Sequence, residues 1–172
     1  MLLDLSRIRT GTEHVERRYE PPALHRDDDV FRLASPVELV ADAHKDQQKI
    51  RLKGRVRATL DLDCSRCVES FQLPVDAPFD MLFLPVVENT GEGEREVAED
   101  DLGVSYYQDD TIDLGEVIRE QFYLALPMKP LCREDCRGLC PVCGANRNRD
   151  NCSCQHEWVD PRLEPLKNLR KL

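Results

Sequence analysis

The sequence lacks the features that mark membrane proteins, exported proteins and the common enzyme families. Within its 172 residues no apolar run approaches the ~20 residues that a membrane-spanning helix needs. Residues 1–7 hold no long apolar stretch and no small-residue cleavage site, so a secretory signal is not expected. A glycine-rich phosphate loop, a His-Glu-x-x-His helix and a Gly-x-Ser-x-Gly elbow are also missing. We therefore expect a cytoplasmic protein with neither membrane contact nor a small-molecule substrate.

The overall charge is acidic, with a formal net charge of −9 at pH 7. This balance normally argues against a nucleic-acid partner, but the charges are unevenly distributed. Residues 45–57 carry six basic residues against one acidic residue, and residues 128–172 carry nine against six. Residues 88–120 carry twelve acidic residues against two arginines. Acidity lowers the expectation of strong, nonspecific RNA binding, while a local basic contact stays open.

Eight cysteines are the strongest chemical signal in the chain. In a reducing cytoplasm four disulfides are not expected, so metal binding is the better interpretation. Zinc favours tetrahedral sets of four thiolates, and closely spaced cysteine pairs let one turn of the chain supply two ligands. We therefore predict two structural zinc ions, each held by four cysteines.

The spacing of the cysteines predicts how they divide between two sites. One set is compact, with the spacing Cys-x2-Cys-x8-Cys-x-Cys, and comprises Cys140, Cys143, Cys152 and Cys154. Pro141 and Gly144 favour the tight turn of a zinc knuckle there. The other set joins two distant segments and comprises Cys64, Cys67, Cys132 and Cys136. Cys136 and Cys140 could exchange roles, and His156 could replace one thiolate.

Cys64 and Cys67 also allow a second interpretation, as a redox-active dithiol. A thioredoxin-like pair sits at a helix N-terminus, where the helix dipole lowers a thiol pKa. Here both flanks have the pattern of strands, so a knuckle on a hairpin is favoured and a thiol-disulfide redox protein is the alternative. Both predicted metal sites are closed by four thiolates, leaving no open position for a substrate. We expect that the protein is not an enzyme.

Alternating apolar residues predict strands in the first half of the chain. The clearest strand places apolar side chains at even positions between Ile50 and Leu62, interrupted only by Gly54. Residues 37–44 alternate in the same way and could pair with that strand through a turn at 46–48. From Phe71 the odd positions are apolar, and two prolines, Pro74 and Pro78, suggest an edge or irregular strand. Residues 14–20 are polar and give no clear pattern.

One helix is well signalled. Asp113 can cap it, and Glu116 follows three residues later, as in a capping box. An apolar face then runs through five residues, and Pro127 ends the helix; the face comprises Leu114, Val117, Ile118, Phe122 and Ala125.

Together these elements predict an α+β fold. The expected core is an antiparallel sheet or a partly open barrel with one packed helix and a C-terminal zinc-knuckle element. Residues 1–127 would form the sheet-plus-helix domain, with a solvated acidic loop at 88–103. Residues 128–172 would form the cysteine-rich zinc-binding element and a basic amphipathic tail that starts at Arg162.

Several motifs occur together in the order found in one protein family. They are Cys64-Ser65-Arg66-Cys67 with Phe71, Asp113-Leu114, Leu124-Ala125-Leu126-Pro127, the block 131–144, and Asp160-Pro161-Arg162. In these motifs the chain closely resembles the YceD family of bacterial and plastid proteins, over nearly its whole length. The resemblance implies a role in the accumulation of large-subunit ribosomal RNA. It supplies a process rather than a mechanism.

A basic strand face suggests where a partner could bind. Arg51, Lys53, Arg55 and Arg57 would project from one face of a strand at ~6.6–7 Å spacing, comparable to phosphate spacing along a nucleic acid. With the resemblance, this predicts a non-enzymatic zinc-binding factor for ribosome biogenesis, needed for synthesis, processing or stability of large-subunit rRNA. Its partner would be precursor rRNA or a basic ribosomal protein. A zinc-ribbon adaptor in transcription is a further alternative.

Overall fold

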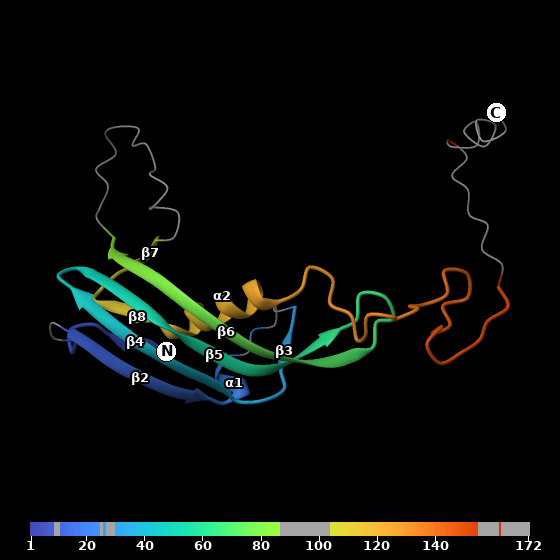
Figure 1. Cartoon of the computed structure of the whole chain (residues 1–172), viewed down its shortest axis with the longest axis horizontal. Helices are drawn as coiled ribbons and strands as arrows, with labels where there is room; N and C mark the ends of the chain where they lie inside the picture. The colour runs from blue at the N-terminus through green and yellow to red at the C-terminus, as the bar shows by residue number, and fades with distance from the viewer. Residues whose placement is uncertain (9–10, 25, 27–29, 87–103, 155–161, 163–172) are drawn as a thin grey trace.

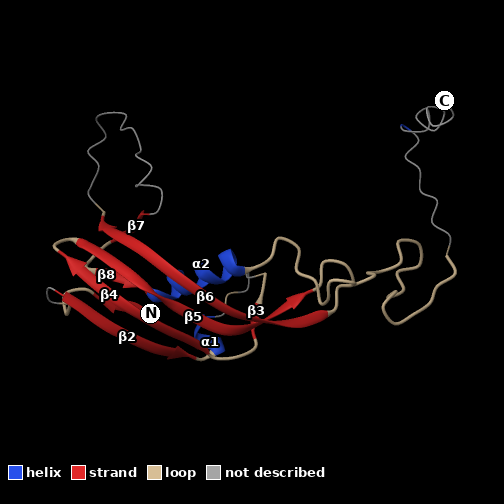
Figure 2. Cartoon of the chain, viewed as in Figure 1, coloured by secondary structure: helices blue, strands red, loops and turns tan. Residues whose placement is uncertain are grey.

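The computed structural model describes residues 1–8, 11–24, 26, 30–86, 104–154 and 162 of the chain. Strands make up most of the regular secondary structure among the described residues (Figure 2). The strands are β1 (Leu2–Asp4), β2 (Gly11–Tyr19), β3 (Arg32–Leu33), β4 (Val37–Asp46), β5 (Lys49–Asp63), β6 (Ser70–Pro85), β7 (Val104–Tyr107) and β8 (Thr111–Asp113). The helices are α1 (Pro21–Leu24) and α2 (Leu114–Ala125).

The strands form two open sheets. The larger sheet has the order β2-β4-β5-β6-β7, with β3 also paired to β5, and the smaller sheet pairs β1 with β8. All strand pairs are antiparallel except β6 and β7, which are parallel. Among the described residues the larger sheet ends at β2 and β7, so the expectation of a partly open barrel was wrong. The expected antiparallel sheet is confirmed in part, because one pair of strands, β6 and β7, is parallel.

The predicted hairpin of residues 37–62 is confirmed. β4 pairs with β5 from Glu38 with Arg57 to Asp46 with Lys49. The apolar positions of both strands point to one face and are buried, with Leu39, Leu52 and Leu60 fully so. Burying each such side chain contributes roughly 1.5–3 kcal/mol, which strongly specifies this register.

The prolines of β6 lie where the sheet tolerates them. Pro74 is opposite Thr59 and Pro78 is opposite Arg55, both on β5. On its other side β6 pairs with β7 only from Leu82 onward. Because proline has no amide hydrogen to donate, it fits a stretch that is an edge among the described residues. The edge position inferred from these prolines is therefore confirmed.

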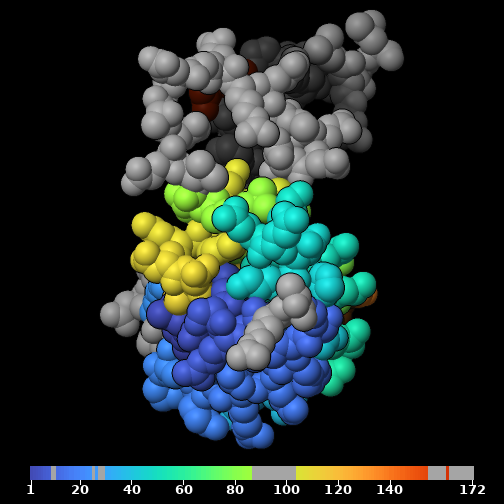
Figure 3. Space-filling model, turned by 90° about the vertical axis from the view of Figure 1, so that its left-hand side faces the viewer, coloured from blue at the N-terminus to red at the C-terminus, as the bar shows by residue number. Residues whose placement is uncertain are grey.

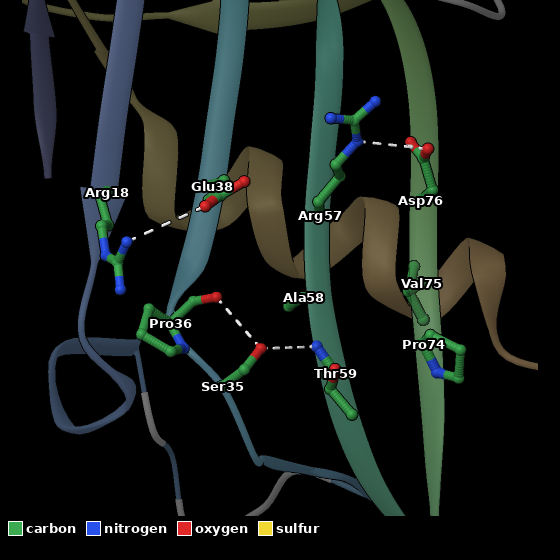
Figure 4. Close-up of a pocket in the computed structure, with 10 residues that line it drawn as sticks. All are labelled: Arg18, Ser35, Pro36, Glu38, Arg57, Ala58, Thr59, Pro74, Val75 and Asp76. Atoms are coloured by element: carbon green, nitrogen blue, oxygen red, sulfur yellow. Dashed lines mark hydrogen bonds and ion pairs between the residues drawn. The ribbon is translucent and has the colours of Figure 1, made fainter.

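Helix α2 covers the buried face of the sheet (Figures 1 and 4). Asp113 caps it by accepting a hydrogen bond from the Gly115 amide at 2.8 Å. Glu116 contacts Arg26. The buried face matches the prediction through Phe122, but Gln121 is buried and Ala125 is exposed, because the helix ends at that residue. The capped helix therefore presents its apolar side to the core.

Among the first 24 residues, strand β2 and helix α1 were not predicted. β2 forms from a polar sequence because it is an edge strand, in which only Val15 is fully buried. Helix α1 is a single short turn that buries Leu24. Figure 3 shows the end of the molecule where N-terminal residues, in blue, meet the β4–β5 turn in cyan and residues near β8 in yellow. A hydrogen bond of 2.8 Å from the Leu5 amide to the Asp110 carbonyl joins the first and last of these segments.

The cysteine-rich residues extend from one end of the larger sheet. Residues 130–154 continue in loops and turns beyond the hairpin of β5 and β6 (Figures 1 and 2). The acidic loop of 88–103 and all residues of the tail after Arg162 lie outside the described residues. The division into domains 1–127 and 128–172 stays a prediction. The cysteine-rich segment is nevertheless anchored to the hairpin end.

Candidate metal centre

The first cysteine cluster forms where the β5–β6 turn meets the segment after α2. Cys64 and Cys67 come from the turn, and Cys132 and Cys136 come from the later segment. Their four sulfur atoms all lie within 4.8 Å of one another. Cys64, Cys67 and Cys136 are at most 3% exposed. Phe71 packs against this cluster and also against the main core, so the two hydrophobic clusters are continuous.

The second cluster is local and more exposed. It contains Cys140, Cys143, Cys152 and Cys154, whose sulfur atoms also lie within 4.8 Å of one another. Cys140 is buried, whereas Cys143 and Cys154 are exposed. Cys136 lies in the first cluster and Cys140 in the second, so the structure separates the two residues whose roles could be exchanged. His156 lies outside the described residues.

Both clusters begin with the same backbone turn. In the first, the Cys64 amide donates to the Glu69 carbonyl and the Val68 amide donates to the Cys64 carbonyl, both at 2.9 Å. In the second, the Cys140 amide donates to Ala145 and the Gly144 amide donates to Cys140, both at 2.8 Å. The residue after the second cysteine has a left-handed backbone in each turn, with φ of 59° at Val68 and 72° at Gly144. These are two copies of one knuckle.

The geometry of the first cluster fits a tetrahedral metal ion. The sulfur atoms of Cys64 and Cys136 are 3.8 Å apart, and those of Cys67 and Cys132 are 3.7 Å apart. A zinc–sulfur bond of about 2.3 Å in a regular tetrahedron places the sulfurs about 3.8 Å apart. Two cysteine clusters of four residues each could therefore hold metal ions, as the spacing of the cysteines predicted.

The thiols of the first cluster differ strongly in acidity. Burial acts to raise the pKa of Cys64, but hydrogen bonds from the backbone of Cys132, Arg66 and Cys67 outweigh it and lower that pKa to about 6. Burial and hydrogen bonds shared with the neighbouring thiols raise the pKa of Cys132 to about 12. Adjacent thiols cannot all ionise without a compensating positive charge. A divalent cation would supply that charge.

The thiols of the second cluster also differ in acidity. Hydrogen bonds from the backbone of Cys143 and Val142 lower the pKa of Cys140 to about 6, against the effect of burial. A hydrogen bond to the Cys143 side chain, together with burial, raises the pKa of Cys154 to about 12. One thiol in each cluster is thus prepared as an anion at neutral pH, while another keeps its proton until a cation displaces it.

Sequence reasoning missed the residues that hold the two segments together. The Arg66 side chain donates to the Cys136 carbonyl at 2.8 Å, and the Arg66 carbonyl accepts from the Leu139 amide at 3.0 Å. Gly138 has φ of 70°, and a Cβ there would lie 2.8 Å from the Arg66 carbonyl oxygen. The Asn148 side chain donates to the Cys136 sulfur at 3.3 Å. The glycine was visible in the sequence, but its close approach to Arg66 was not.

The basic side chains predicted to bind a partner are arranged as expected along one solvent face of β5. They are Arg51, Lys53, Arg55 and Arg57, and each side chain is at least 48% exposed. They are not free, however. Asp80 on β6 contacts Arg51 at 2.7 Å and Lys53 at 3.9 Å, and Asp76 contacts Arg55 at 3.0 Å and Arg57 at 3.3 Å. The neighbouring strand neutralises half of this charge.

The strand register shows that positive and negative charges are balanced across the whole solvent face of β2, β4, β5 and β6. Positions that align with the four basic residues on β2, β4 and β6 add one further cation and five anions. The cation is Arg18, and the anions are Glu16, Glu38, Asp42, Asp76 and Asp80. Five positive charges therefore face five negative charges. The surface is ionic but close to neutral, which weakens long-range attraction of a polyanion.

A shallow hollow of about 570 Å³ lies on the same face (Figure 4). Its charged residues engage one another, because Arg18 approaches Glu38 at 4.0 Å and Arg57 approaches Asp76 at 3.3 Å. Among the residues that line it, the Ser35 hydroxyl accepts a hydrogen bond from the Thr59 amide at 2.8 Å. These contacts serve the sheet itself and do not form an arrangement of catalytic groups.

Within the described residues, none of the helices has the length and apolar character that crossing a bilayer requires.

The fold and the two clusters define a β-sheet protein with an appended cysteine-rich element that could bind metal. The chain belongs to the YceD family: the family model described as "Large ribosomal RNA subunit accumulation protein YceD" matches residues 52–170. The match includes all eight cysteines. The family resemblance stated from the motifs is confirmed, and the link to accumulation of large-subunit ribosomal RNA is carried by the names of the family and of its plant members.

Known relatives come from plants and bacteria. The chain is 29% identical over 186 residues to "Large ribosomal RNA subunit accumulation protein YCED homolog 1, chloroplastic" of Arabidopsis thaliana, covering 95% of this chain and 58% of the relative. It is 34% identical over 120 residues to an uncharacterized protein of Mycobacterium tuberculosis, covering 70% of this chain and 55% of the relative. The chain thus spans little more than half of these relatives. No solved structure matches it.

Proposed function

We propose that this chain is a non-enzymatic, zinc-stabilised factor that supports accumulation of large-subunit ribosomal RNA in the cytoplasm. The observation that carries the proposal is the family match over residues 52–170, which include both cysteine clusters. Each cluster is a complete set of four protein thiols, so a bound ion would keep no open position for water or substrate. Zinc would hold the β5–β6 turn against the segment that follows α2.

Elemental mass spectrometry of protein purified under reducing conditions tests the zinc part of the proposal. We expect close to two zinc ions per chain, and close to one in a Cys140→Ser/Cys143→Ser variant. That variant should keep the sheet, because its cysteines lie outside the strands. Metal-free protein with intact disulfides would refute the proposal, and an unchanged metal content in the variant would refute the assignment of the second site.

For the direct partner we place a basic ribosomal protein ahead of precursor rRNA. The formal net charge of −9 favours a cationic partner, and the solvent face of the sheet carries balanced charges. For Arg51 or Arg55 to bind phosphate, the phosphate would have to compete with Asp80 or Asp76. The charge balance thus supports contact with a protein. Binding of RNA by the four basic residues of β5 stays a prediction.

A pull-down with a nuclease arm separates the two partners. Tagged protein is recovered with and without ribonuclease treatment, and both RNA and protein are identified. We expect a basic large-subunit protein to survive the nuclease. Loss of every ribosomal protein after nuclease, together with binding of large-subunit rRNA by the purified chain, would favour direct RNA contact instead.

The ion pairs of β5 and β6 allow a sharper test of the RNA prediction. Replacing the four basic residues by glutamine should weaken RNA binding and flatten its salt dependence if phosphates bind there. The matched control is Asp76→Asn/Asp80→Asn, which frees the same cations and should strengthen that binding. If neither variant changes RNA affinity, this face does not bind RNA.

Deleting the gene in its host tests the process itself. Large-subunit rRNA should fall relative to small-subunit rRNA, and the wild-type gene should restore it. Normal large-subunit rRNA after deletion would end the ribosome proposal, whichever surface binds the partner.

The thiol-disulfide alternative is disfavoured by the burial of its cysteines. An attacking thiolate must reach a disulfide in solution, and Cys64 and Cys67 are only 2% and 3% exposed. Their turn joins two strands rather than opening a helix. The lowered pKa of Cys64 is also what a metal ligand requires.

A further inference from the structure

Asn148 lies in sequence between cysteines of the second cluster, but its side chain contacts the first cluster. It lies in the loop between Cys143 and Cys152, both residues of the second cluster. Its side-chain nitrogen donates to the sulfur of Cys136 in the first cluster at 3.3 Å. Its side-chain oxygen accepts from the Arg137 amide and from the Arg133 guanidinium, both at 2.8 Å. One half-buried side chain therefore touches a candidate ligand and the backbone beside it.

The whole loop is seated against the first cluster. Asn146 is bridged to Leu139, and the Arg147 amide donates to the Gly138 carbonyl at 2.9 Å. The Arg149 guanidinium contacts Glu69, two residues after Cys67, at 2.7 Å. An ion in the second cluster would tie both ends of this loop, at Cys143 and Cys152. The position of Asn148 would then depend on the occupancy of a site to which it contributes no ligand.

We propose that Asn148 couples the two metal sites, so that an ion in the second cluster raises the affinity of the first cluster for its own ion. This inference rests on the proposed occupancy of both clusters. The amide of Asn148 stabilises the negative charge on Cys136, and outer-shell hydrogen bonds of this kind change metal affinity about 10–100-fold. Binding free energies are linked reciprocally, so an ion in the first cluster must also tighten the second site.

A merely structural role for Asn148 predicts a different result. In that case its oxygen would hold the backbone near Arg137 and its nitrogen would be dispensable. Asn148→Asp distinguishes the two roles because it keeps the shape and the acceptor oxygen. The substitution removes the N–H donor and places a carboxylate oxygen beside the Cys136 sulfur. Coupling predicts a loss of affinity in this variant, whereas a structural role predicts none.

The matched control is Asn151→Asp, which adds the same charge to the same loop. Among the described residues, Asn148 donates a side-chain hydrogen bond to the Cys136 sulfur and Asn151 does not. Metal affinity of the full-length chain is measured by competition with a chromophoric chelator for Zn²⁺. The visible spectrum of bound Co²⁺ independently reports the four-thiolate geometry.

Three variants are compared with the wild-type chain: Asn148→Asp, Cys140→Ser/Cys143→Ser, and the two combined. We expect the first two each to lower the affinity of the first cluster about 10-fold or more. The combination should lower it no further, because both remove the same interaction. Asn151→Asp should leave the first cluster unchanged.

Unchanged first-cluster affinity in Asn148→Asp overturns the coupling, and so does a multiplied loss in the combined variant. If the double cysteine variant fails to fold, Asn148→Asp alone decides the question. In that variant the zinc affinity of the second cluster, to which Asn148 contributes no ligand, must fall together with that of the first. A wild-type chain that binds two ions independently overturns the inference but leaves the proposed function intact. A wild-type chain that binds no metal overturns both.

Discussion

The two cysteine clusters share one knuckle but connect very different parts of the chain. Cys64 and Cys136 of the first cluster are 72 residues apart, and they join the end of the main sheet to the segment after α2. The second cluster closes a loop within residues 140–154. The entropy cost of closing a loop grows with its length, so an ion in the first cluster organises far more of the chain. The same ligand chemistry can thus stabilise a fold or only a loop.

The two clusters also differ in how deeply they are buried. The first cluster is buried and continuous with the hydrophobic core through Phe71. In the second cluster Cys143 and Cys154 are exposed. Burial shields the first site from chelators and protons, whereas the second site stays open to both. Four predictions test this contrast.

The largest effect is expected from Cys64→Ser compared with Cys152→Ser. The first substitution unties distant segments and should cost several kcal/mol of stability, a fall in Tm on the order of 10 °C. The second unties a local loop and should shift global unfolding much less. Thermal unfolding followed by circular dichroism in zinc-containing buffer measures both. Equal shifts would contradict the different roles assigned to the clusters.

Acid should empty the second site before the first. Metal binding requires thiolates, so protons compete with the ion and affinity falls as the pH falls. Without metal the pKa of Cys64 and that of Cys140 are both about 6, so protonation of these prepared anions becomes important below that pH. Because Cys143 is exposed, the second ion should leave first during titration from neutral to about pH 5.

Zinc release is followed with a chromophoric chelator. The Cys140→Ser/Cys143→Ser variant is the control, because it should show only the release at lower pH. Simultaneous loss of both ions from the wild-type chain would show that burial does not separate the two sites.

Two glycines with nearly equal backbone angles give a smaller, matched comparison. Gly138 and Gly144 have φ of 70° and 72°, so alanine pays the same conformational cost at both, about 1 kcal/mol. At Gly138 the new Cβ would also lie 2.8 Å from the Arg66 carbonyl oxygen, whereas at Gly144 nothing lies within 4 Å. Gly138→Ala should therefore be the more destabilising in urea unfolding. Equal costs would mean that the contact with Arg66 relaxes freely.

The smallest effect is expected at Val68, which occupies the knuckle position of Gly144. A β-branched residue with φ of 59° is strained, and its side chain is 65% exposed. Val68→Gly should release about 1–2 kcal/mol of strain and lose roughly 0.5–1 kcal/mol to chain entropy, for a small net gain. Denaturant unfolding measures it, and Gly144→Val should show the opposite sign. A loss of stability in Val68→Gly would indicate that the valine makes a compensating contact.

Local pattern by itself determined much of this protein. The alternation in residues 37–62 predicted β4, β5 and their buried face, because a period of two places every second side chain against the core. Asp113 and Pro127 marked the ends of α2, and the cysteine spacing predicted the grouping in both clusters. Each of these features depends on residues close together in the chain or on the spacing of cysteine pairs, and the structure then separated Cys136 from Cys140.

The tertiary structure decided what distant strands and loops bring together. Polar β2 becomes a strand only because β4 offers it a partner, and no local pattern indicated that β7 would pair in parallel with β6. Alternation showed which face of β5 carries Arg51 and Arg55, but the register with β6 placed Asp80 and Asp76 beside them. Asn148 likewise reaches Cys136 only because its loop is seated on the first cluster. The sequence period specifies the direction of a side chain, whereas its electrostatic partners depend on which backbone lies within a few ångströms.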